Sequence, residues 1–203
     1  MRILACVAGL AASLSLATGA EAALVAYTFS GIGSGELGGS AFTDTGFDII
    51  LVGDTDLVAD PFFTGDLFEI SPLASARVAI DGFGDAVVTS QTRLGINRTA
   101  NVFYFGQIFG PDYLDLGVSE SDEEAFSFAA PYGPVAGAAN TFGQFTGLAT
   151  TQGALTFTSV RDVSFVAAPG PTAAVPEPAA WALMILGFAG AGVMLRRRAW
   201  IPA

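Results

Sequence analysis

Between residues 24 and 168, apolar and polar positions alternate with the period of two that is typical of β-strands. The alternation is plain at the start of this region, where Val25, Tyr27 and Phe29 are separated by small or polar residues. It recurs in short segments at residues 47–51, 77–81, 114–116, 155–157 and 163–165. No segment has the sustained i, i+3, i+4, i+7 apolar spacing of an amphipathic helix. The pattern therefore predicts many short strands and no helix longer than three turns.

Glycines stand between these segments throughout, and threonine and phenylalanine are plentiful. Many short strands separated by turn residues predict an all-β fold. We expect a jelly-roll-like β-sandwich over residues 23–168, with an open barrel as the alternative. Because this region has no tryptophan, phenylalanine supplies the bulk of the core. The side chains expected to point inward are Phe29, Phe47, Ile49, Val78, Ile80, Leu155, Phe157 and Phe165.

Residues 1–22 have the three-part pattern of a secretory signal peptide. Arg2 supplies a positive start, residues 3–17 form an apolar run, and Ala20-Glu21-Ala22 is a small-x-small cleavage site before Ala23. The run is short for a membrane span, which disfavours a transmembrane anchor as the alternative. We therefore predict export through the general secretion machinery, with a mature N-terminus at Ala23.

A second apolar run lies near the C-terminus, after a linker of proline and small residues at 169–175. Ala179–Leu195 contains no charge and is followed directly by Arg196, Arg197 and Arg198. At 1.5 Å per residue such a helix is about 25 Å long, and snorkelling arginines can cover the shortfall from an average bilayer core. The pattern predicts one transmembrane helix over residues 179–195, with a cytoplasmic C-terminus and the body on the outer side of the membrane.

Directly before this run stands Pro176-Glu177-Pro178, followed by Trp181 and Ala182. With the apolar run and the terminal arginines, this order resembles the PEP-CTERM family of sorting tails, in the PEPxxWA variant of Gram-negative bacteria. The resemblance covers residues 175–198. It implies recognition by exosortase, a membrane-embedded transpeptidase-like enzyme, which would cleave near the triplet. The inner-membrane anchor would then be transient, and the body would move to the cell surface or into extracellular polysaccharide.

The residues of the triplet suit such a role physically. Two prolines fix φ on both sides of Glu177 and prevent a helix from starting before Pro178, so an extended segment would stand at the membrane face. Glu177 is then a presented anion that a positive pocket can bind. A plain single-span anchor with a proline-rich stalk is the alternative interpretation.

Charge and composition exclude several partners and enzyme classes. The chain has a net charge of −11, and the region between the terminal segments is near −13, so we expect no nucleic-acid partner. There is no histidine or lysine, and the single cysteine, Cys6, lies in the predicted signal peptide. The mature chain therefore lacks Cys–His and Ser–His nucleophiles, Schiff-base lysines, zinc ligands and disulfides. We expect a protein that is not an enzyme.

Three motifs admit both a chemical and a structural interpretation. Asp54, Asp56 and Asp60 offer oxygen ligands for calcium, although aspartate is also a common turn residue; no other cofactor is expected. The acidic run at residues 120–124 predicts a solvated loop. Residues 33–38 match the G-x-G-x-x-G pattern, but no helix is predicted after them. We therefore expect a loop that enters another strand rather than a dinucleotide site.

Three functions stay open on this basis. The first is a non-catalytic surface or matrix protein that contributes to the envelope, a biofilm or extracellular polysaccharide. The second is a glycan- or ice-binding module; an ice-binding face would need a repeated T-x-T array, and Thr156 and Thr158 form the only such pair in the predicted strands. The third and least favoured is a carboxylate-dependent hydrolase, which would need two facing carboxylates in a cleft.

Overall fold

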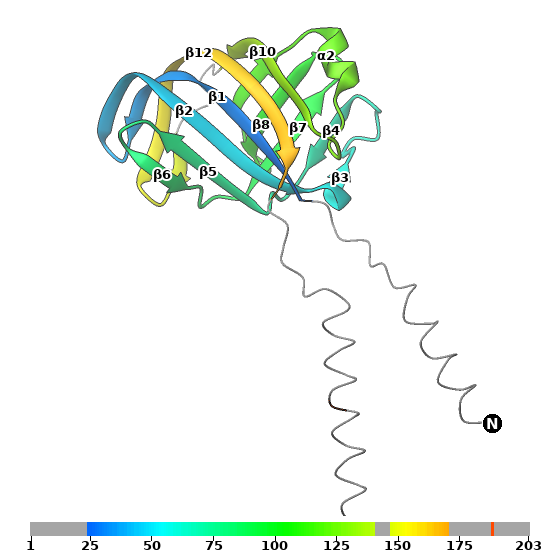
Figure 1. Ribbon diagram of the computed structural model, residues 1–203, viewed down its shortest axis with the longest axis horizontal. Helices are drawn as coiled ribbons and strands as arrows, with labels where there is room; N and C mark the ends of the chain where they lie inside the picture. Colours follow the sequence, from blue (N-terminus) through cyan, green and yellow to red (C-terminus); the bar gives the residue numbers. More distant parts are fainter. Residues whose placement is uncertain (1–23, 141–146, 171–187, 189–203) are drawn as a thin grey trace, which may run out of the picture. The chain divides into compact units, whose positions relative to one another are not determined.

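The computed structural model describes residues 24–140, 147–170 and 188, and antiparallel strands account for most of these described residues (Figure 1). The strands are β1 (Leu24–Leu37), β2 (Ser40–Asp54), β3 (Val58–Ala59), β4 (Leu67–Ile70), β5 (Ser75–Ile80), β6 (Gly84–Val87), β7 (Thr92–Asn97), β8 (Val102–Gln107), β9 (Asp112–Gly117), β10 (Tyr132–Asn140), β11 (Leu148–Thr150) and β12 (Gly153–Pro169). The helical elements η2 (Thr55–Leu57) and α2 (Glu120–Ala125) are each shorter than three turns. The predicted all-β fold is confirmed.

The strands form one continuous sheet in the order β3-β4-β7-β8-β9-β10-β12-β1-β2-β5-β6, with β11 paired to β12. We call β1, β2, β5, β6, β11 and β12 the first half, and β3, β4, β7, β8 and β9 the second half. Strand β10 joins them, because its first part pairs with β12 and its last part with β9. The sheet curls so that β12, β1 and β2 lie across β8 and β7 (Figure 1). The two layers expected of a sandwich are thus the halves of a single sheet.

The free edge of the first half is covered by its own chain. Val88, just after β6, forms a β-bridge with Thr150 of β11, and the Thr89 N–H donates to the Ala149 carbonyl at 2.9 Å. Strands β11, β12, β1, β2, β5 and β6 therefore close into a ring. Closure removes an unpaired edge that would otherwise offer a template for aggregation.

All eight side chains that the alternation predicts to point inward are buried, with exposed fractions of 5% or less. The centre of the core is aromatic. Phe165 of β12 stacks on Phe103 of β8 with 4.6 Å between ring centroids, and this contact joins the inner faces of the two halves. The Tyr27 hydroxyl donates to the Phe128 carbonyl at 2.7 Å, which satisfies a buried polar group. Burial also raises the pKa of Tyr27 far above its ordinary value.

The G-x-G-x-x-G segment at residues 33–38 is strand and turn rather than the expected loop. Its pairing with β12 continues as far as Leu37, which lies opposite Leu155. Gly38 and Gly39 then make the turn into β2 with φ angles of 58° and 87°, which glycine adopts without strain. No helix follows the turn, so the geometry of a dinucleotide site is missing at these described residues.

Candidate functional site

The sorting residues predicted from the sequence lie outside the described residues. They are Pro176, Glu177, Pro178, Trp181, Ala182, Arg196, Arg197 and Arg198, and the signal-cleavage residues Ala20, Ala22 and Ala23 lie outside as well. Of the helix predicted over residues 179–195, only Phe188 is described. Among the residues that the structure describes, no helix is long and apolar enough to span a membrane.

The structure does show where these two segments attach to the body. The N–H of Gly170, just after β12, donates to the carbonyl of Leu24 at the start of β1, at 2.8 Å. Strand β12 ends at Pro169, one residue beyond the end predicted for the body at residue 168. The predicted signal peptide and the predicted sorting tail therefore join the body at neighbouring points.

Of the three aspartates predicted as calcium ligands, Asp54 and Asp60 accept backbone N–H groups with their carboxylates, and Asp56 contributes its own N–H to Asp54. Asp54 accepts the N–H of Asp56 at 2.9 Å and caps η2. Asp60 accepts the N–H groups of Phe62 and Gly65, at 3.1 and 2.6 Å. In the described part of the chain, no three acidic, histidine or cysteine side chains form a group that could hold a metal ion. The contacts are those of turn residues, and calcium binding stays a prediction.

The acidic run at residues 120–124 is helical, so the prediction of a solvated loop was wrong. Ser119 caps α2, because its Oγ accepts the N–H of Asp122 at 3.2 Å and donates to the carboxylate of the same residue at 2.6 Å. Acidic side chains in the first turn also interact favourably with the helix dipole. The spacing Ser-x-x-Asp is a variant of the capping box, and it was visible in the sequence.

One carboxylate of this helix points into the body. The Glu123 side chain is only 4% exposed, and its Oε1 lies 3.2 Å from Nη1 of Arg98. The guanidinium of Arg98 also lies over the ring of Phe68, 5.4 Å from its centroid. The Tyr132 hydroxyl holds the helix from β10 by donating to the Asp122 carbonyl at 2.6 Å. These contacts tie α2 to β10 and to the segment after β7.

A second group of charged side chains lies on the outer face of the second half. Arg93 of β7 donates to Glu69 Oε2 of β4 at 3.2 Å and to Asp112 Oδ1 of β9 at 3.0 Å. Tyr104 of β8 donates to the same Glu69 oxygen at 3.1 Å, and its ring centroid lies 5.4 Å from the guanidinium carbon of Arg93. We call these four residues the Arg93 cluster.

A glycine makes the Arg93 cluster possible. Gly95 lies opposite both Glu69 and Tyr104 in the strand register. A Cβ atom at Gly95 would clash with the end of the Tyr104 side chain, so only glycine leaves room for it. Burial raises the pKa of Tyr104, and the charge and hydrogen bond of Glu69 raise it further, so this hydroxyl stays a neutral donor. Because one guanidinium holds both carboxylates, the cluster orders the face and presents no free acid–base pair.

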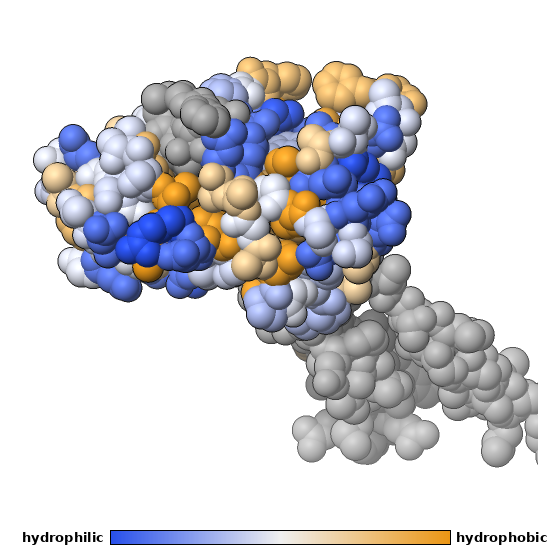
Figure 2. Space-filling model, turned by 90° about the horizontal axis from the view of Figure 1, so that it is seen from above, coloured by the Kyte–Doolittle hydropathy of each residue, from blue (hydrophilic) through white to orange (hydrophobic). Residues whose placement is uncertain are grey.

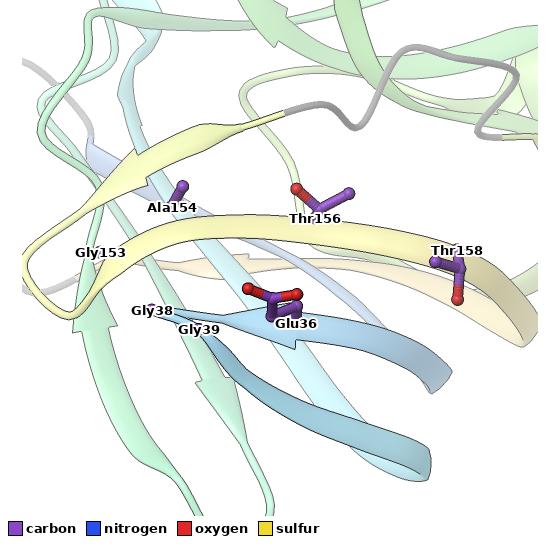
Figure 3. A pocket seen from close by; sticks show the side chains of 7 residues that line it. All are labelled: Glu36, Gly38, Gly39, Gly153, Ala154, Thr156 and Thr158. Carbon is purple, nitrogen blue, oxygen red and sulfur yellow. The ribbon is translucent and has the colours of Figure 1, made fainter.

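A groove of about 500 Å³ lies beside the turn between β1 and β2 (Figure 3). It is lined by Glu36, Gly38, Gly39, Gly153, Ala154, Thr156 and Thr158. Of these described lining residues only Glu36 is titratable, so the groove lacks a second carboxylate for hydrolysis.

The two threonines of the T-x-T pair use their hydroxyls within the protein. Thr156 Oγ1 accepts the N–H of Gly147 at 3.2 Å, and Thr158 Oγ1 donates to the Ser34 carbonyl at 3.1 Å. An ice-binding face would need such hydroxyls arrayed toward water. The pair therefore gives no support to an ice-binding function.

Comparison with known proteins identifies the C-terminal segment. Residues 174–198 match the family model of the PEP-CTERM protein-sorting motif. No curated protein and no solved structure matches the chain. The match confirms the resemblance seen at Pro176–Ala182 and the residues that follow. The motif is the signal of an exported protein that exosortase sorts and processes at the membrane.

Proposed function

We propose that this chain is a non-catalytic surface or extracellular-matrix protein of a Gram-negative bacterium, and that exosortase releases its β-sheet body from a transient anchor in the inner membrane. The observation that carries the proposal is the sorting motif at residues 174–198. The motif specifies how the chain is handled, and the body is the part that remains to act outside the cell.

The proposed sequence of events follows from the two terminal segments. The chain is exported, and the signal peptide is removed before Ala23. The helix over residues 179–195 then holds the chain in the inner membrane, with Arg196–Arg198 on the cytoplasmic side. Exosortase engages the extended triplet Pro176–Pro178 at the membrane face and separates the body from the helix.

The use of the carboxylates supports a non-catalytic body. Glu69 and Asp112 are both paired with Arg93, Glu123 is paired with Arg98, and Asp60 accepts two backbone N–H groups. Each of these acidic groups stabilises local structure. A hydrolase of the carboxylate-pair type would instead keep two such groups facing a cleft.

The proposal is tested by following the tail in the native host. Replacing Glu177 by Gln preserves the shape of the triplet and removes its charge, so it isolates the electrostatic part of recognition. We expect the Glu177→Gln variant to accumulate at full length in the inner membrane, whereas the wild-type protein loses its tail and appears at the cell surface. Immunoblotting of membrane and surface fractions, with and without exosortase, measures both forms.

The matched control is Glu124→Gln, which removes the same charge from an exposed position of α2. This variant should be processed like the wild type. A wild-type protein that keeps its C-terminal helix in a host with active exosortase would contradict the proposal and leave a plain membrane anchor.

A further inference from the structure

Three phenylalanines on two loop tips expose most or all of their side chains. Phe62 and Phe63, in the loop between β3 and β4, are 67% and 94% exposed. Phe109, in the turn between β8 and β9, is fully exposed. An aromatic ring held in water contributes nothing to the hydrophobic core and lowers solubility. These rings therefore need an explanation other than folding.

The backbone at two of these positions is strained as well. Phe63 and Phe109 both have a φ of 56°, in the left-handed region that disfavours bulky side chains. The other non-glycine residues of the described chain with positive φ are Asp44, Asn101 and Asp162, types that tolerate this conformation. An unfavourable backbone conformation at a residue whose ring is exposed is typical of a residue that binds a partner.

Both tips are fixed in place by hydrogen bonds. The carboxylate of Asp60 accepts the N–H groups of Phe62 and Gly65, which closes the first loop around one side chain. In the second loop the carbonyl of Gly110 accepts a hydrogen bond from Arg93 at 3.5 Å. The rings are therefore presented by ordered loops, and binding would lose little conformational entropy in either of them.

The two tips flank one hydrophilic surface. Leu67, at the end of the first loop, lies in register with Asn97 and through it with Val102, the first residue of β8. Phe109 follows the other end of β8, so the tips are separated by a strand of six residues, about 20 Å. The Arg93 cluster lies on the outer face between them. Figure 2 shows apolar groups that project separately from one edge of the body, with hydrophilic residues between them.

From this arrangement we infer that the outer face of β4, β7, β8 and β9 binds an extended, neutral polysaccharide. The C–H face of a sugar ring is apolar and packs on an aromatic ring, while the hydroxyls around its edge can donate to the carboxylate of Asp112, whose side chain is 30% exposed. Exposed aromatic rings at the two ends of a polar face suit a long ligand whose sugar rings are apolar on their faces and polar at their edges.

Charge and geometry disfavour the other occupants. A body near −13 repels anionic polymers such as nucleic acid and acidic polysaccharide. The centre of a protein interface is depleted of charged residues, whereas these tips are separated by charged groups. A bilayer could contact both tips only by desolvating the carboxylates between them. The inference rests on the proposed function in one respect, because export brings the body to polysaccharide outside the cell.

The test is affinity electrophoresis of the purified exported protein in native gels that contain dextran, mannan or laminarin, with alginate as the polyanion. We expect at least one neutral polysaccharide to retard the protein and alginate to have no effect. The double variant Phe63→Gly/Phe109→Gly should bind at least tenfold more weakly. Its melting temperature should be unchanged or higher, because glycine adopts a positive φ without strain.

The matched control is Val87→Ser, which removes an exposed apolar side chain from β6 in the first half and should leave binding unchanged. Absence of retardation by all three neutral polysaccharides, or equal retardation of the double variant, would overturn the inference. So would sedimentation with phosphatidylethanolamine/phosphatidylglycerol vesicles that depends on the two phenylalanines, since the ligand would then be lipid. In each of these cases exosortase-dependent loss of the tail would still stand on its own evidence.

Discussion

Each half of the sheet holds two of the four arginines of the body, and the two pairs lie in different environments. In the first half, Arg77 pairs with Asp85 at 2.7 Å, but both side chains are about half exposed. Arg161 is equally exposed beside Asp44 and Asp162. In the second half, Arg93 and Arg98 hold carboxylates that are largely withdrawn from water.

The difference shows that the distance within an ion pair is a poor measure of its contribution to stability. Exposed pairs exchange good hydration for modest attraction and contribute little. Removing one partner of a buried pair leaves a charge that water cannot reach, which is strongly destabilising. We therefore expect the second half, where Arg93 and Arg98 lie 3.0–3.2 Å from their carboxylate partners, to depend more on its arginines than the first half, where Arg77 lies only 2.7 Å from Asp85.

The largest effect should come from Arg98→Met, which removes the partner of the buried Glu123 while preserving most of the aliphatic stem. We expect the free energy of unfolding to fall by about 2–3 kcal/mol, measured by urea denaturation. Adding Glu123→Gln removes the orphaned charge and should restore part of the loss, so a double-mutant cycle reports the coupling directly. A loss below about 0.5 kcal/mol for Arg98→Met would contradict the expectation that the buried ion pairs of the second half contribute more to stability than the exposed pairs of the first half.

A smaller effect should appear at alkaline pH through Tyr104. Burial and Glu69 raise the pKa of this hydroxyl in the folded protein, whereas an unfolded tyrosine ionises near pH 10. Above pH 10 the unfolded chain therefore binds fewer protons than the folded one. The free energy of unfolding should then fall by up to about 1.4 kcal/mol per pH unit for this group. Tyr104→Phe should flatten the decline above pH 10, with no change of slope between pH 6 and 9, as measured by denaturation across that range.

Tyr27 offers the matching experiment in the first half, where burial alone raises the pKa of its hydroxyl. Tyr27→Phe should flatten the same alkaline decline. If neither variant changes the slope, ionisation of buried tyrosine is not what destabilises the protein at high pH.

The smallest effect should come from Arg77→Met in the first half. Both partners of this pair are exposed, so we expect a change in the free energy of unfolding below about 0.5 kcal/mol, in spite of the 2.7 Å contact. The measurement is the same urea titration as for Arg98→Met. A loss comparable to that of the buried pair would show that burial does not separate the two halves.

The sequence was most informative about the core. Alternation reports on which face of a strand is covered, and it placed side chains such as Phe29, Ile49 and Phe165 correctly because that property is local. The short helix at residues 120–125 also has a local cause, since Ser119 caps it, but a run of acidic residues without an apolar face does not show helical periodicity. Residues 33–38 were expected to form a loop, whereas strand pairing extends through this glycine-rich segment as far as Leu37.

The Arg93 cluster could not be predicted from the alternation of apolar and polar positions. Glu69 and Arg93 are 24 positions apart, and they meet only because β4 pairs with β7. Nothing in either segment specifies that pairing. The role of Gly95 likewise depends on Tyr104 from the neighbouring strand, which the local sequence does not specify. The exposure of Phe63 and Phe109 could not be predicted from the sequence either. In a chain so rich in phenylalanine, only the structure shows which rings face water.

The neighbouring positions of Leu24 and Gly170 have a mechanical consequence for a tethered body. Strand β12 is 17 residues long and is hydrogen-bonded to β1 along most of its length, with β10 and β11 on its other side. A pull on the tail along the axis of β12 would load these hydrogen bonds in shear, so that many must break together. A pull between the two ends of the body would instead open the β1–β12 pair from Gly170 inward, one bond after another. In the proposed sequence of events the signal peptide is removed, so that Leu24 is no longer a point of attachment and the proposed tether would load the body only through β12, the longest of its described strands.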